Sequence, residues 1–183
     1  MMTGTRTSRL TLLLTILLLP LSSIASEVRI TTGFSPGGSA VENILTAINS
    51  ARQSIDVAAY SFTSKPVAIA LDNASQSGIR VRVVADAKDN GGRYSAVTWL
   101  KHNGIPVRLN DRYAIQHNKF MVIDGVTTQT GSFNYTSSAV KRNAENTVVI
   151  WNEPSTAQAY QNDAVEEAHP KVRTILPASH WSM

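Results

Sequence analysis

The stretch QHNKFMVIDGVTTQTGSFNYT, Gln116 to Thr136, decides what fold and what site this chain can form. Its first half is apolar enough for a buried strand. Asp124-Gly125 is a strong hairpin signal, because a type I′ turn needs a positive φ at both of its central positions. We therefore expect a strand that ends near Ile123 and an antiparallel strand that returns over residues 126–134.

The polar side chains of this hairpin are expected to meet on one face. A two-residue loop pairs residue 123 with 126 and, further out, His117 with Ser132, and side chains along a strand alternate with a period of two. A bulge near Gly131 would change this register. Without one, four polar side chains project from the same side of the hairpin: His117, Lys119, Ser132 and Asn134.

This set of side chains suits phosphoryl transfer. A neutral imidazole is a nucleophile or a general base, and a lysine with two neutral donors is what a phosphate oxygen anion needs. Taken singly, His117 is typical of a half-buried strand, and Ser132 and Asn134 are ordinary turn residues. Lys119 is harder to explain in this way, because an unpaired lysine that faces a core is costly. Their joint occurrence favours a functional site.

Strands and helices alternate around this hairpin, which favours an α/β sheet with helices packed on it. Two polar segments, GFSPGGSA (33–40) and KDNGG (88–92), are expected to be loops. The sequence shows no internal repeat. Further strands are expected at 27–31, 54–62, 79–87, 105–109 and 146–151, and helices at 41–52, 65–77, 94–104 and 155–168.

Residues 1–25 have the layout of a secretory signal peptide, with Arg6 and Arg9 before the apolar run LTLLLTILLLPL and small residues at Ser23 and Ala25. We expect cleavage after Ala25 and a single mature domain over residues 26–183, with an uncleaved anchor as the alternative. Export of this kind suggests the periplasm, with secretion beyond it as an open alternative.

Charge and cysteine content set further bounds. The chain has 17 Lys+Arg and 13 Asp+Glu; the first 25 residues hold two of the former and none of the latter, so the mature charge is 15 − 13 = +2. A small positive balance is compatible with a polyanionic ligand but does not require one. The absence of cysteine excludes disulfides, thiolate zinc sites and a cysteine nucleophile.

The string His117-x-Lys119-x-x-x-x-Asp124, followed by GSFN, resembles the H-x-K-x-x-x-x-D and G-S-x-N signature of the phospholipase D superfamily. The small size, the single motif and the segments GFSPGGSA, AAYSFTS and KRNAENTVVIW are similar to its small bacterial endonucleases of the Nuc/EndA type. This resemblance implies an α/β fold with a mixed β-sheet flanked by helices on both faces, in a single domain.

The resemblance also implies roles for the site residues. His117 is expected to attack phosphorus and form a phosphohistidine, with Lys119, Ser132 and Asn134 binding phosphate. Glu145 matches the acidic residue that orients the imidazole, since a carboxylate at Nδ1 leaves Nε2 free to attack. Asp124 is expected to be a structural member of the motif, because its turn position explains it without chemistry.

A single motif implies a homodimer. One histidine cannot readily serve as both nucleophile and leaving-group acid on opposite sides of one phosphorus, and His102, His169 and His180 lie outside any second motif. We therefore expect a two-fold axis to bring two His117 side chains together.

The nucleic-acid contacts are expected from basic residues in loops near strand ends. For Arg80 and Arg82, a solvated strand face and nucleic-acid contact remain equal alternatives. Phe62 and Tyr135 could stack on bases or pack in the core. The stronger candidates for contact with the phosphate backbone are Lys88, Arg93, Lys141 and Arg142.

We expect no metal and no cofactor, since Asp86 and Asp89 lack ligand spacing and the lysine supplies positive charge. The expected function is sequence-nonspecific endonuclease cleavage of DNA, with RNA left open, and without membrane binding by the mature form. Two alternatives stay open: a phospholipase D-type lipid phosphodiesterase, and a nucleic-acid-binding or structural protein with an incidental histidine.

Overall fold

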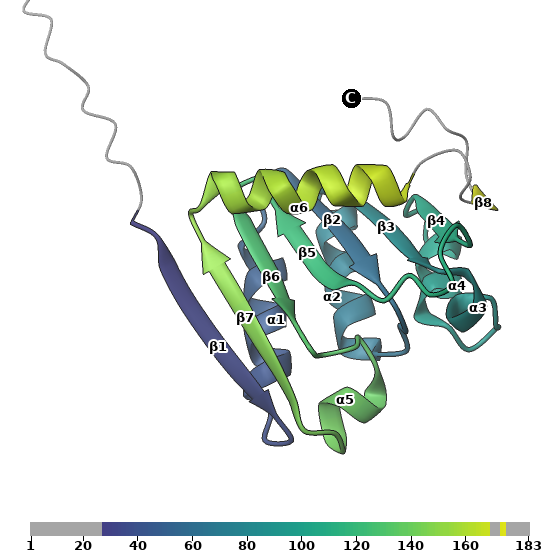
Figure 1. Cartoon of the computed structure of the whole chain (residues 1–183), viewed down its shortest axis with the longest axis horizontal. Coiled ribbons are helices and arrows are strands. Elements are labelled where there is room, and N and C mark those ends of the chain that lie inside the picture. Colours follow the sequence, from purple (N-terminus) through teal and green to yellow (C-terminus); the bar gives the residue numbers. More distant parts are fainter. Residues whose placement is uncertain (1–26, 169–172, 175–183) are drawn as a thin grey trace, which may run out of the picture.

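The computed structural model describes residues 27–168 and 173–174 (Figure 1). The signal peptide expected at residues 1–25 lies outside the described residues, as do His169 and His180.

The described strands form one mixed sheet in the order β1-β7-β6-β5-β2-β3-β4-β8. β2 runs parallel to β3, and β3 parallel to β4, whereas the other neighbouring pairs are antiparallel. The strands are β1 (Arg29–Ser35), β2 (Ser54–Ala59), β3 (Arg80–Asp86), β4 (Val107–Asn110), β5 (Lys119–Ile123), β6 (Thr127–Gly131), β7 (Glu145–Trp151) and β8 (Arg173–Thr174).

Helices cover both faces of this sheet, which confirms the expected α/β class with its mixed sheet (Figure 1). α1 and α2 pack on one face around the larger core, and α6 crosses the opposite face over β5 and β6. The helices are α1 (Ser39–Ser50), α2 (Lys65–Gln76), α3 (Ala87–Asn90), α4 (Ala96–His102), α5 (Ser137–Lys141) and α6 (Pro154–Glu167).

β2 and β3 lie in the middle of the sheet and are buried along almost their whole length. Strands covered on both faces need apolar residues at successive positions, which these runs provide. The exception is a buried ion pair, in which Arg82 Nε lies 2.5 Å from Asp56 Oδ1. Arg82 is therefore neither a solvated nor a nucleic-acid-facing residue, whereas Arg80 is exposed.

The hairpin register differs from the expected one by one residue. Asp124 and Gly125 take the positive φ values of the expected turn, 53° and 66°, and Val126 N donates to Ile123 O. However, Ile123 pairs with Thr127 and Phe120 with Thr130. Val126 is an extra residue outside the ladder, where its carbonyl accepts from Glu153 N at 2.8 Å. The predicted pairing of 123 with 126 was wrong because this tertiary contact holds Val126 away from the ladder.

Other boundaries moved where neighbouring strands or caps extend an element. β1 continues to Ser35, inside the segment expected to be a loop, because it pairs with β7 along its whole length. Gly33 permits this, since a Cβ there would lie 2.3 Å from the Ser39 carbonyl oxygen of α1. α3 replaces the start of the other expected loop, because the Asp86 carboxylate accepts from the backbone N–H groups of Lys88 and Asp89.

Candidate active site

The candidate residues meet at one edge of the sheet because the strands reverse direction there. β5 begins at this edge opposite the end of β2, with Lys119 paired to Ala59. β6 ends and β7 begins at the same edge, since each runs antiparallel to its neighbour. Residues that are distant in sequence are therefore close in space, as is usual for sites at strand ends in α/β folds.

The segment that carries His117 is held by a buried carboxylate of α6. Glu167, only 2% exposed, accepts from Gln116 Nε2 at 2.9 Å and from Asn118 Nδ2 at 2.7 Å. Asp86 Oδ2 accepts from the backbone N–H of Gln116 at 2.9 Å. Both neighbours of His117 are thus fixed. Burial raises the pKa of Glu167, and the two amide donors act against this rise.

Lys119 is a largely buried cation beside His117. Its Nζ donates to the His117 carbonyl at 2.5 Å and lies 5.4 Å from the centroid of the Tyr60 ring. Burial lowers the pKa of Lys119, while the nearby Glu145 carboxylate acts in the opposite direction. The Tyr60 ring also lies 4.7 Å from the His117 ring, centroid to centroid, so one aromatic residue contacts both His117 and Lys119.

Ser132 and Glu145 form a hydrogen-bonded pair next to this lysine. Ser132 Oγ donates to Glu145 Oε2 at 2.6 Å and accepts from Asn146 N at 3.0 Å. Gly131 allows the end of β6 to lie close to the start of β7. Its φ is 145°, and a Cβ there would lie 2.3 Å from the Asn146 carbonyl oxygen. The second Glu145 oxygen accepts from Asn143 Nδ2 at 3.0 Å.

His117, Lys119 and Ser132 line one open pocket of about 370 Å³, together with Gly131 and Tyr160. Asn134 does not line it, and its buried Oδ1 has no hydrogen-bond partner among the described residues. Glu145 bonds Ser132 and Asn143 rather than the His117 ring. The pocket can place an anion against an ammonium and a hydroxyl, with an exposed imidazole at its side.

Asp124 lies at the opposite end of β5 from His117 and joins the turn to the start of β2. Its Oδ1 accepts from the backbone N–H groups of Gln53 (2.8 Å) and Ser54 (2.9 Å), and its Oδ2 from that of Arg52 (2.8 Å). A carboxylate that accepts three backbone bonds fixes the local geometry.

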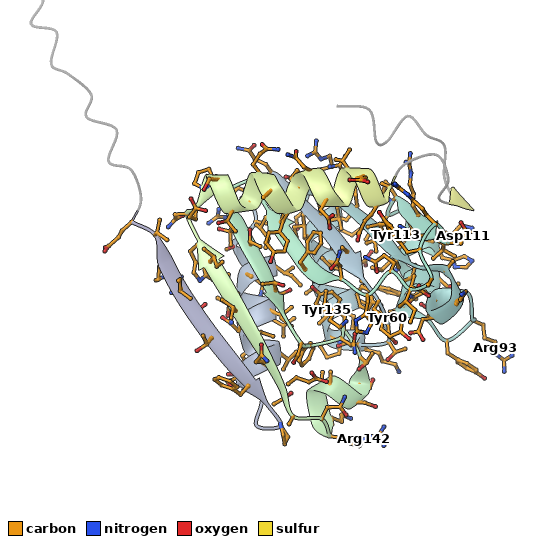
Figure 2. All side chains as sticks on the ribbon, in the orientation of Figure 1. Tyr60, Arg93, Asp111, Tyr113, Tyr135 and Arg142 are labelled. Carbon is orange, nitrogen blue, oxygen red and sulfur yellow. The ribbon has the colours of Figure 1, made fainter. Side chains whose placement is uncertain are left out.

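The four basic candidates are all exposed. Lys88 Nζ donates to the Ala114 carbonyl, Arg93 lies over the Tyr94 ring, and Arg142 donates to Ser138 Oγ. Figure 2 shows Arg93 at the right of the molecule, beside α3 and α4, and Arg142 at its lower edge, beside α5. Lys141 ends α5 on the same side.

Two aromatic candidates belong to the core. Phe62 and Tyr135 are 0% exposed and pack against each other with ring centroids 5.5 Å apart. Tyr135 also donates to Gln129 Oε1 at 2.7 Å, and burial raises the pKa of its hydroxyl. Neither ring is available to stack on a base in this structure.

Sequence reasoning missed three residues that belong to the site: Tyr60 contacts His117 and Lys119, Tyr160 lines the pocket, and Glu167 holds both neighbours of His117. Tyr60 follows directly after a buried strand that pairs with β5, and it lies in AAYSFTS, one of the segments that carry the family resemblance. Tyr160 and Glu167 belong to α6. Their position at the site depends on how this helix crosses the sheet, which no local sequence pattern predicts.

Among the described residues, no group of three or more His, Asp or Glu side chains is arranged to hold a metal ion. Within the same part of the chain, none of the helices is both long and apolar enough to cross a membrane.

The family model described as "Cardiolipin synthase, PLD-like domain" matches residues 44–166. A curated relative is Phospholipase D of Rickettsia conorii, 33% identical over 137 residues, which are 75% of this chain and 68% of that protein. Human mitochondrial cardiolipin hydrolase is 34% identical over 117 residues, and the match spans less than half of that protein, 46%.

Two solved structures share the fold. Nuc from Salmonella typhimurium, described as a phospholipase D family member, superposes with a TM-score of 0.79 and 39% sequence identity, covering 82% of this chain and 100% of that one. NucT from Helicobacter pylori has a TM-score of 0.74 at 22% identity, covering 81% of this chain and 100% of that one, and shows likeness in fold alone.

Proposed function

This chain belongs to the phospholipase D superfamily as one of its phosphodiesterases, and on that premise we propose that it is a metal-independent, sequence-nonspecific endonuclease. Its substrate is DNA, with RNA as a second candidate polymer, and its active site is shared across a homodimer. The observation that carries the proposal is the meeting of His117, Lys119 and Ser132 in one open pocket at the sheet edge.

The first chemical step is attack of His117 Nε2 on phosphorus. A P–N bond forms, the bond from phosphorus to the leaving oxygen breaks, and that oxygen takes a proton from a general acid. The Lys119 ammonium stabilises the negative charge on the non-bridging oxygens, as does the Ser132 hydroxyl. Water then attacks the phosphohistidine, breaks the P–N bond and gives its proton back to the acid.

Substrate binding also gives Glu145 a role. Ser132 now donates to Glu145. When the hydroxyl turns to phosphate, Oε2 of Glu145 becomes free to accept the Nδ1–H of His117, which fixes the tautomer that leaves Nε2 unprotonated. Asn134, whose Oδ1 accepts no hydrogen bond from the described part of the chain, is a further candidate for contact with phosphate through its amide N–H groups.

The general acid comes from a second subunit. His102 is the other histidine in the described part of the chain, and its Nδ1 lies 2.7 Å from the Thr98 carbonyl oxygen at the end of α4, in no second motif. We therefore assign the proton donor to His117 of the partner subunit, related by a two-fold axis.

Exposed basic residues at the sheet edge that holds the pocket support a polyanionic substrate. Lys88, Arg93, Lys141 and Arg142 are exposed, and contacts to phosphates carry no sequence information. Likeness over the whole length of Nuc supports the same class. A periplasmic location is part of the proposal, and the signal-peptide layout expected at residues 1–25 supports it.

A lipid phosphodiesterase is the second candidate, because the curated relatives are named for phospholipid cleavage. His117 would attack a lipid phosphodiester by the same steps. The nucleic-acid assignment is preferred because several exposed basic side chains at the same sheet edge suit a chain of phosphates better than a single headgroup.

The test is cleavage of supercoiled plasmid by the mature protein in excess EDTA, with His117→Asn as control. We expect wild type to nick and linearise the plasmid and the variant to leave it intact. Parallel incubation with phosphatidylglycerol vesicles measures the alternative. Cleavage that stops with EDTA and returns with a divalent ion would refute metal independence, and full activity in a strict monomer would refute the shared site.

A further inference from the structure

A second concave surface, which we call the α2–α4 groove, lies between α2 and α4 and has a volume of about 440 Å³. Its walls include Lys65, Ile69, Arg93, Tyr94 and Trp99. Tyr94 is 79% exposed and Trp99 42%. Large aromatic side chains that stay in contact with water at a concave surface mark binding sites.

The charges around the groove have one sign. Lys65 and Arg93 are cations, and none of the described residues that line the groove carries a carboxylate. The Arg93 guanidinium lies over one face of the Tyr94 ring, 4.6 Å from its centroid. The ring is otherwise largely in solvent, so its second face is free to receive a flat partner.

The groove is tied to the catalytic pocket by one buried amide. Asn90, 1% exposed, donates to the carbonyl of Tyr60, and its Oδ1 accepts from Phe62 N (3.1 Å) and Ser95 Oγ (3.0 Å). Tyr60 contacts the His117 ring. Thr63, in the groove wall, follows Tyr60 by three residues, which limits their Cα separation to about 11 Å, roughly three stacked nucleotides.

We propose that the α2–α4 groove binds unpaired bases of a single-stranded nucleic acid whose scissile phosphate lies in the His117 pocket. This inference rests on the proposed nuclease function and extends it to a substrate form. Every base has a face that can stack on Tyr94 or Trp99, while Lys65 and Arg93 neutralise the adjoining phosphates. A duplex keeps its bases stacked inside and can offer this groove its backbone alone.

Binding is measured by fluorescence anisotropy of a labelled 12-nucleotide deoxythymidine strand and of a matched 12-base-pair duplex. The protein carries His117→Asn throughout, so that the probes stay intact. We expect Tyr94→Ala to weaken binding of the single strand about 5-fold to 150-fold, and Tyr94→Phe to change it less than about twofold, because Phe keeps the stacking face. Arg93→Gln should lower the salt dependence, with a slope smaller by about 0.7.

Tyr113 supplies the matched control. It is also an exposed tyrosine with an arginine over its ring, Arg112 at 5.2 Å, and it lies outside the groove (Figure 2). Tyr113→Ala should leave single-strand binding unchanged. Duplex binding by Tyr94→Ala should change less than about twofold, because duplex bases cannot reach the ring.

Activity separates this inference from the proposed function on which it rests. In the chain with His117 intact, Tyr94→Ala should turn over bis(p-nitrophenyl) phosphate, too small to reach the groove, at the wild-type rate. Equal losses on single strand and duplex, loss on the small substrate, or a change in oligomeric state would overturn the base-binding assignment. Single-strand binding that depends on Tyr94, in a protein that cleaves no nucleic acid, would support the groove and refute the nuclease.

Discussion

The Asp124 carboxylate offers a sharp test of whether a motif residue acts in folding or in chemistry. Its two oxygens accept three backbone N–H groups, from Arg52, Gln53 and Ser54. Asp124→Asn is the suitable change, because asparagine tolerates the left-handed φ of 53° at this position and keeps the shape of the side chain.

The expected loss of stability in Asp124→Asn follows from these three hydrogen bonds. Asparagine keeps one acceptor oxygen, which can serve Gln53 and Ser54, but it turns an N–H₂ donor toward the N–H of Arg52. A hydrogen bond to a charged group contributes about 1.5–3 kcal/mol, and the half-exposed position lets water replace part of the loss. We expect the free energy of unfolding to fall by about 2 kcal/mol, which lowers Tm by about 4–8 °C for a domain of this size.

Thermal unfolding tests whether Asp124 acts in folding, and turnover of bis(p-nitrophenyl) phosphate at 25 °C tests whether it acts in the reaction. The expected outcome is a lower Tm with kcat within about twofold of wild type. Asp89→Asn, at an exposed carboxylate, is the control and should change stability by less than about 0.5 kcal/mol. A kcat more than tenfold lower at an unchanged Tm would show that Asp124 serves the reaction and would refute the structural reasoning.

Three further predictions concern Lys119 and Glu167, the buried ionisable residues of the site. Burial lowers the pKa of Lys119, so its ammonium loses its proton at a lower pH than that of a free lysine. The pH profile of kcat/KM should therefore have an alkaline limb with its midpoint below about pH 10.4. Lys119→Arg should move that limb to higher pH. A limb at or above the free-lysine value would contradict this. Glu167→Gln should lower kcat about tenfold, because one of the two amide donors beside His117 loses its acceptor, whereas Glu166→Gln, at an exposed neighbour, should not. Burial raises the pKa of Glu167, so the stability that this group contributes is complete below about pH 4.3 and is lost as pH rises through the pKa of the folded state. The difference in Tm between wild type and Glu167→Gln should therefore change with pH over that window. An unchanged kcat in Glu167→Gln would show that the carboxylate does not position the histidine.

The elements themselves were largely readable from local patterns. Apolar runs predicted β2, β3 and β5. Pro66 marked the start of α2, and Gly78 marked its end. Their alternation led to the α/β class, and the motif from His117 to Asn134 led to the family. The failures lie where the partner of a segment decides its conformation. The extent of β1 depends on β7, and the slip at Val126 depends on Glu153, which is distant in sequence.

The candidate site divides in the same way. The sequence by itself determined which residue types could do phosphoryl chemistry, because the identity and spacing of a histidine, a lysine and a serine are properties of the chain. Only the tertiary structure decided their partners: Tyr60 contacts both His117 and Lys119, Glu145 accepts a hydrogen bond from Ser132, and the Glu167 carboxylate holds the segment before β5. The physical reason is that side-chain periodicity reports which face of an element is buried, whereas the packing of α6 across the sheet and the meeting of strand ends at one edge set which residues touch.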